Sequence, residues 1–252
     1  MLLASRRALL SLGVVAVCAG AIATALAADS KRPITKLSYD PSLPKIELFE
    51  GLDNGSLTAK VVPQSQFGGT VLVTNTTKTP LSVKVPEAVV GVQVFPQLGG
   101  MGGMGGGGAA GGAGFFSIPA ERTVSVPMTS VCLEHGKANP NSRMTYRLAR
   151  PSDVSDKPEL PELLRMVGQN KIDRGAAQAA AWHIANGMTW DKIAAEKFDH
   201  VGRPDEPYFS QDQLAAARMV VADVQAKARD KAKEEKTEES KTSRVRATVK
   251  AE

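Results

Sequence analysis

Cysteine and aromatic residues are both scarce in this chain. The only cysteines are Cys18 and Cys132, and aromatic residues make up 5% of the sequence. We expect Cys18 to be removed with an N-terminal export signal, so Cys132 has no partner for an intramolecular disulfide. With so few aromatic residues, no platform for stacking carbohydrate is obvious.

Histidine is scarce too, and the common enzyme motifs are missing. None of the three histidines precedes Cys132, although a blue-copper site built around Cys132 and His135 would need a second histidine on an earlier strand. The sequence has no Gly-x-Ser-x-Gly elbow, no His-Glu-x-x-His helix and no Gly-x-x-x-x-Gly-Lys phosphate loop. We therefore expect no enzyme and no cofactor.

Net positive charge is confined to the two ends of the chain. The formal net charge is +5, and Arg6 and Arg7 would leave with the export signal. The last 26 residues hold nine Lys or Arg and six Asp or Glu, which accounts for the remaining +3. The neutral middle of the chain predicts that nucleic acid is not a partner.

The N-terminus has the order of a secretory signal peptide. Ser5-Arg6-Arg7 precedes an apolar run over residues 9–26, which is followed by Ala27 in an Ala-Leu-Ala ending. We predict a signal peptide over 1–27 and no stable membrane insertion after cleavage. The protein would then be exported to the periplasm, the cell surface or the extracellular space, by the Sec or the twin-arginine route.

Short runs of alternating or β-branched residues follow a predicted linker over 28–39. They are separated by Asn, Gly and Pro turns at the spacing of an antiparallel β-sandwich. The segments VTNTTKTPLSV and IPAERTVSVP resemble the immunoglobulin-like sandwiches of exported bacterial proteins. This resemblance covers residues 40–148 and implies only the fold.

A glycine-rich run, GGMGGMGGGGAAGGAG over 99–114, lies between two of the predicted strands. We predict a long loop over 98–114 that can change length at little entropic cost. Met101 and Met104 have the Met-x-x-Met spacing of exported Cu(I) sites, because thioether ligands suit that soft ion. The loop could instead act as an adhesive tip.

Helical patterns begin after residue 148. We predict a helical subdomain over 149–208, in which Asp173 caps one helix, Gly187 ends it and Thr189 caps the next. A charged amphipathic helix over 209–236 and a disordered tail over 237–252 would follow. The whole chain resembles uncharacterised secreted bacterial proteins that combine an immunoglobulin-like sandwich with a helical C-terminal part.

Two short segments resemble the motifs of bacterial surface thioester domains. They are Val131-Cys132-Leu133-Glu134 and Ala177-Gln178-Ala179-Ala180-Ala181-Trp182. The resemblance implies that the Cys132 sulfur displaces ammonia from the Gln178 amide, and that Trp182 keeps water from the resulting thioester. In the simpler interpretation, Cys132 is a buried small hydrophobic residue, and Gln178 and Trp182 pack a helix on a sheet.

We therefore expect a non-enzymatic binding or structural protein of the bacterial cell envelope. Its partner would be an envelope or extracellular protein or polymer, bound at the glycine-rich loop or at the seam between sandwich and helices. Covalent adhesion through a Cys132–Gln178 thioester is one alternative. Weak Cu(I) binding by Met101 and Met104 is another.

Overall fold

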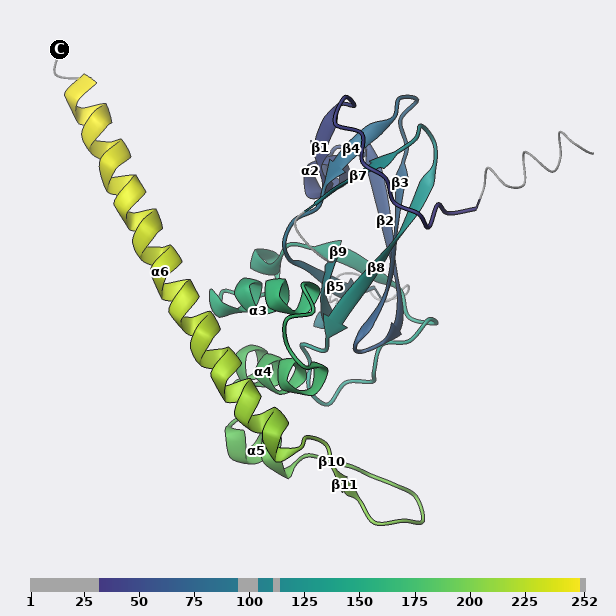
Figure 1. The fold of residues 1–252 in the computed structure, drawn as a ribbon, viewed down its shortest axis with the longest axis vertical. Helices are drawn as coiled ribbons and strands as arrows, with labels where there is room; N and C mark the ends of the chain where they lie inside the picture. The colour runs from purple at the N-terminus through teal and green to yellow at the C-terminus, as the bar shows by residue number, and fades with distance from the viewer. Residues whose placement is uncertain (1–31, 95–103, 111–113, 250–252) are drawn as a thin grey trace, which may run out of the picture.

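The computed structural model describes residues 32–94, 104–110 and 114–249, and side chains are not described for 104–110 and 239–249. The predicted signal peptide therefore lies outside the described residues. The fold is mixed α/β, with a β-rich part, a group of short helices and a long C-terminal helix (Figure 1). None of the described helices combines the length and apolar character needed to cross a membrane.

Six antiparallel strands close into a barrel. Their order around the barrel is β2 (Leu57–Ser65), β3 (Gly68–Asn75), β8 (Thr123–Val131), β6 (Met104–Ala110), β5 (Val89–Gln93) and β9 (Tyr146–Ala149). The pair formed by Val61 and Tyr146 closes β9 onto β2. The immunoglobulin-like sandwich expected for 40–148 is thus not confirmed by the strand order.

A smaller sheet packs against one end of the barrel. It consists of β1 (Lys45–Glu47), β4 (Leu81–Lys84) and β7 (Phe115–Ile118), with β1 parallel to β4. The short helix α2 (Leu48–Asp53) follows β1, and the Glu47 carboxylate caps it by accepting hydrogen bonds from two backbone N–H groups. Sheet and barrel share one core, made of Val61, Val73, Val83, Val124, Phe116, Ile118 and their neighbours.

The glycine-rich segment differs from the predicted loop over 98–114, because strand β6 lies within it. β6 pairs with β5 on one side and with β8 on the other, so it completes the barrel. Helix α3 (Glu159–Gly168) packs against β6 and β8. A strand of glycine presents no side chains over Gly105–Gly108, which allows the helix to approach the sheet closely. Sequence patterns missed this strand because glycine is depleted in strands and its role here depends on distant partners.

The short helices begin and end where the sequence predicts. Asp173 accepts hydrogen bonds from two backbone N–H groups at the start of α4 (Arg174–Asn186), and Gly187, with φ of 65°, follows its last residue. Thr189 caps α5 (Trp190–Ala195). The chain also forms a 3-10 turn, η1 (Pro151–Asp153), and a small hairpin of β10 (Lys197–Phe198) and β11 (Glu206–Pro207).

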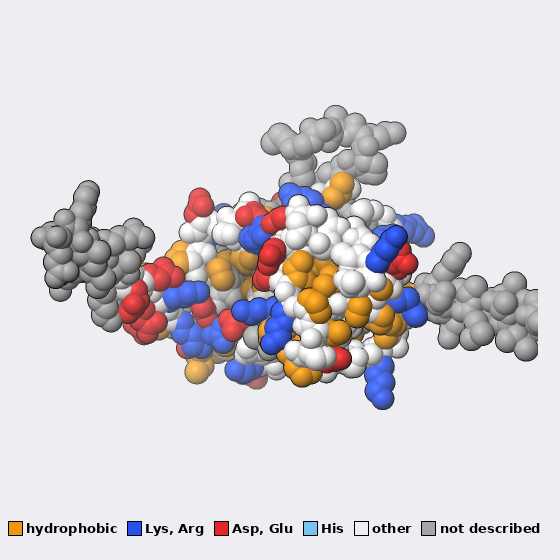
Figure 2. Space-filling view, turned by 90° about the horizontal axis from the view of Figure 1, so that it is seen from above, with side chains coloured by type: hydrophobic (Ala, Val, Ile, Leu, Met, Phe, Trp, Pro, Cys, Tyr) orange, Lys and Arg blue, Asp and Glu red, His pale blue; other side chains and the backbone are white. Residues whose placement is uncertain are grey.

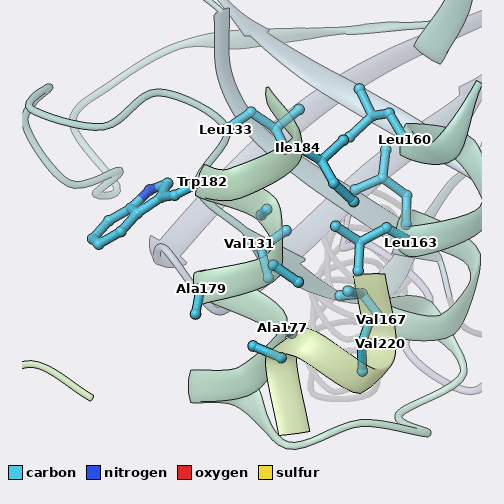
Figure 3. Close-up of a cluster of buried hydrophobic side chains, with 14 of the residues drawn as sticks. Val131, Leu133, Leu160, Leu163, Val167, Ala177, Ala179, Trp182, Ile184 and Val220 are labelled. Atoms are coloured by element: carbon cyan, nitrogen blue, oxygen red, sulfur yellow. The ribbon is translucent and has the colours of Figure 1, made fainter. Parts of the chain in front are cut away.

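Small and aliphatic side chains join the helices to the barrel. Figure 3 shows residues of α3, α4 and the end of β8 meeting in one cluster. Alanines over 176–181 of α4 are almost completely buried, which lets α4 lie close to its neighbours. The labelled members include Val131, Leu133, Leu160, Leu163, Val167, Ile184 and Val220.

The C-terminal helix α6 (Gln211–Val249) is longer than predicted. Its first half packs on α3 and α4 through Leu214, Ala217, Val221 and Val224. Its second half leaves the body of the protein (Figure 1) and covers 237–249, where the sequence predicted a disordered tail. The strong helix formers Ala, Lys, Glu and Arg dominate residues 226–236, and the helix continues from there through 237–249, where Ser, Thr and Val are frequent. Acidic and basic side chains are interspersed on the surface of the protein (Figure 2). On α6, Asp223 forms an ion pair with Lys227 one helical turn later.

Gly69 provides a test of the barrel geometry. A Cβ at this position would clash with the backbone carbonyl of Val62 and lie 2.7 Å from the Cα of Pro63. We predict that Gly69→Ala lowers the free energy of unfolding by about 1–3 kcal/mol, because the backbone must shift to relieve the clash. Urea unfolding measures this change. Thr58→Ala, at an exposed position of β2, should change it by less than about 0.5 kcal/mol, and equal effects of the two substitutions would contradict the geometry.

Candidate functional site

The candidate site lies at the seam where the end of β8 meets α4. Cys132 directly follows the last residue of β8, and Gln178 lies in the middle of α4. The fold thus brings together the two residues that the sequence singled out. Both are buried, with exposed fractions of 4% for Cys132 and 0% for Gln178.

The Gln178 carboxamide forms two hydrogen bonds with the backbone of Cys132. The Cys132 N–H donates to Gln178 Oε1 at 2.9 Å, and Gln178 Nε2 donates to the Cys132 carbonyl at 2.7 Å. Cys132 lies just beyond β8 and is buried, so its backbone N–H and C=O groups need hydrogen-bond partners other than water. An unpaired buried N–H or C=O group would be costly. The side chain of Gln178 therefore acts as a substitute for a neighbouring strand.

The Cys132 thiol has a separate partner. Its Sγ donates to the backbone carbonyl of Glu134 at 3.2 Å. Burial is the largest effect on the Cys132 thiol, and it raises the pKa of this thiol above its ordinary value. Since the thiolate is the reactive form, this environment makes Cys132 a poor nucleophile at neutral pH.

Trp182 lies one turn after Gln178 on α4 and is 6% exposed. Figure 3 shows its ring pointing away from the aliphatic cluster. The ring meets His135 edge-on with centroids 4.7 Å apart, and it also contacts Tyr208 and Phe209 at 5.2 and 5.5 Å. Its Nε1 is buried and has no hydrogen-bond partner among the described residues.

An open groove of about 470 Å³ lies at the same seam. One wall comes from His135, in the turn after β8, and the rest comes from the loop after α4, from α5 and the residue that follows it, and from β10. His135 is held by two contacts: its Nε2 lies 3.0 Å from Glu196 Oε1, and its backbone N–H donates to Asn186 Oδ1. The lining residues are His135, Met188, Lys192, Ala195, Glu196 and Lys197. The sequence suggested this seam as a binding surface but not the residues that line the groove, because His135 and Glu196 come from distant parts of the chain.

A row of aromatic rings leads from the surface to this groove. Phe198 on β10 is 45% exposed and stacks on Tyr208 with centroids 4.2 Å apart. Tyr208 contacts Trp182, which contacts His135 in the groove wall. The Tyr208 hydroxyl also accepts a hydrogen bond from Gln66 Nε2 of the barrel, at 2.6 Å. The sequence suggested no stacking platform, yet the fold gathers rings from separate segments into one.

The methionine pair receives no further support. Met101 lies outside the described residues, and Met104 is the first residue of β6, where side chains are not described. Within the described ranges, no group of three or more His, Cys, Asp or Glu side chains is arranged to hold a metal ion. Cu(I) binding by Met101 and Met104 stays a prediction.

Substitutions at Gln178 test its role at the seam. Gln178→Met keeps the volume but leaves the Cys132 N–H and C=O groups buried without partners, so we expect the free energy of unfolding to fall by about 2–5 kcal/mol. Gln178→Glu should be similarly unstable at pH 7, where the carboxylate cannot donate to the Cys132 carbonyl. Burial raises the pKa of the introduced carboxyl in the folded state, so this group takes up a proton on folding as the pH falls. The protonated carboxyl can donate to the Cys132 carbonyl, and the variant should therefore regain stability as the pH approaches about 4, the ordinary pKa of glutamate.

Urea unfolding at pH 4 and pH 7 measures both effects. Gln211→Met, at an exposed residue in the first turn of α6, is the matched control and should change stability by less than about 0.5 kcal/mol. A Gln178→Met variant as stable as this control would contradict the proposed role.

Comparison of the chain with known proteins identifies no relative. The chain matches no family model, no curated protein and no solved structure. The resemblances to thioester domains and to secreted two-part proteins therefore stay predictions. The function has to be inferred from the seam itself, since a fold alone does not imply an activity.

Proposed function

We propose that this protein is an exported, non-enzymatic binding module of the bacterial cell envelope and that it binds its partner at the seam groove. The observation that carries this proposal is the groove itself, whose walls come from both the barrel side and the helical side. Binding sites occur preferentially in such concave places between packed parts of a protein.

Fixed walls favour binding at the groove. The His135–Glu196 pair connects its two sides, and the hydrogen bonds between Gln178 and Cys132 hold α4 against the end of β8. A site that is already formed loses little conformational entropy when a ligand enters. The Cys132–Gln178 pair then has a positioning role, and the buried thiol needs no reactivity of its own.

Filling the groove tests this proposal. Ala195 is an exposed lining residue, so Ala195→Trp should occupy the groove without disturbing the core. We expect the mature protein to co-sediment with protease-treated envelope polymer from the bacterium that produces it, and Ala195→Trp to bind at least about tenfold more weakly, equivalent to about 1.4 kcal/mol.

Met219→Trp is the matched control, because Met219 is 74% exposed on α6 and does not line the groove. It should bind like the unaltered protein. Failure of the unaltered protein to bind, or equal binding by Ala195→Trp, would overturn the proposal.

A second candidate function is covalent adhesion through an internal thioester. The observation that favours it is the fixed position of the Gln178 carboxamide against Cys132. In this reaction the Cys132 Sγ bonds to Gln178 Cδ, the Cδ–Nε2 bond breaks, and the amide nitrogen leaves as ammonia with the thiol proton. The thiol would first have to leave its hydrogen bond to the Glu134 carbonyl.

Intact mass of the exported protein tests this alternative. A thioester predicts a mass about 17 Da below that of the chain beginning near Ala28, the mass of the lost ammonia. Cys132→Ala should show the full mass of its own sequence. A full mass and a free thiol in the unaltered protein, purified without reductant or added amines, would exclude the thioester.

A further inference from the structure

We infer that two copies of this chain pair through the outer part of α6, residues 229–249, with the two helices antiparallel and their contact centred on Ser240. This inference does not depend on the seam groove. Three observations support it: the exposure of this part of α6, the order of charges along it and its length.

The outer part of α6 extends beyond the packed core. Ala228 is the last buried residue among the described side chains of this helix, and every side chain from Arg229 to Glu238 is exposed. The helix nevertheless continues to Val249 and leaves the body of the protein (Figure 1). Most helices in proteins gain their stability by packing, so this exposed length, about 30 Å, offers a surface for a partner.

Acidic and basic residues are separated along the outer part of α6. Residues 234–239 hold four Glu and one Lys, a net charge of −3. Residues 241–246 hold one Lys, two Arg and no acidic residue, a net charge of +3. Ser240 lies between these two blocks.

The stability of a single helix does not account for this order. Glu235 and Glu239 are four residues apart, where like charges repel on one helix. Basic residues near a helix C-terminus interact favourably with the helix dipole, but this effect falls off within the last turn. Lys241 lies about two turns before Val249. The order of charges therefore favours a partner that carries the opposite order.

A second copy of the chain is such a partner. In an antiparallel pair centred on Ser240, the acidic block of each copy lies beside the basic block of the other. The same patch then serves on both copies, as it does in a two-fold symmetric dimer. A parallel pair would place each block beside its own counterpart of like charge, which is unfavourable.

The length of the outer part of α6 fits the same register. Its middle residue is 239, next to Ser240. In the antiparallel pair, Val249 of one copy lies opposite position 231 of the other, shortly after the last buried residue, Ala228. Pairing thus covers nearly the whole exposed length of both helices, and neither body has to change.

Sedimentation velocity of the full mature chain tests the inference. We expect a dimer at about 100 μM protein in about 0.05 M salt. Its dissociation constant should rise at least about tenfold in about 0.5 M salt, because salt screens the charges that hold the two helices together.

Charge reversal at positions that face each other identifies the contact. Glu234→Lys with Glu239→Lys should weaken the dimer at least about tenfold, because each acidic block then has a net positive charge beside the basic block of its partner. Lys241→Glu with Arg246→Glu should do the same with the opposite sign. All four substitutions together restore opposite charges at these positions, and we expect the affinity to return to within about fivefold of the unaltered protein.

Lys60→Glu with Lys78→Glu is the matched control, because it reverses two exposed lysines outside α6 and should leave the dimer unchanged. A chain that stays monomeric at about 100 μM would overturn the inference, even if another protein binds α6. The inference also fails if the control weakens the dimer as much as the α6 variants do, or if the variant with four substitutions pairs no more tightly than the double variants.

Discussion

The two hydrogen bonds between the Gln178 carboxamide and the Cys132 backbone connect the two parts of this protein. Without them, the chain would leave β8 in a buried place with an unpaired N–H and C=O group. With them, α4 takes a fixed position, and so does Trp182, which lies on it. The placement of the seam groove therefore depends on a polar contact inside an otherwise apolar interface.

Strand β6, which consists mainly of glycine, contributes to the packing of the helices on the barrel by its contact with α3. Its glycines pair through their backbones with β5 and β8 and present no side chains to α3. Alanine in α4 and glycine in β6 thus serve one purpose, because both let backbones of neighbouring elements approach closely. Leucines of α3 and valines of β5 and β8 then fill the space between them.

Aromatic residues are few, but their distribution in space is uneven. Rings from four separate parts of the chain, at His135, Trp182, Phe198 and Tyr208, form one continuous row. This row links the exposed ring of Phe198 to the buried interface at Trp182, and its last ring, His135, lines the groove. A low aromatic content therefore says little about whether a protein can offer a stacking surface.

Local interactions explain what the sequence determined by itself. Asp173, Gly187 and Thr189 set the bounds of their helices because a cap acts only on backbone groups a few residues away. The change from strands to helices near residue 148 was predictable for a similar reason, since each pattern of hydrophobic residues has the period of its own element.

Only the tertiary structure decided the features that are formed by residues far apart in the sequence. The glycine segment became a barrel strand only because β5 and β8 supply its hydrogen-bond partners, and no pattern within the segment indicates them. Gln178 and Cys132 were singled out from the sequence, but the engagement of the Cys132 backbone in place of its sulfur depends on how α4 lies on β8. The groove and its aromatic row likewise exist only once these elements have packed, because their residues come from segments that the sequence keeps apart.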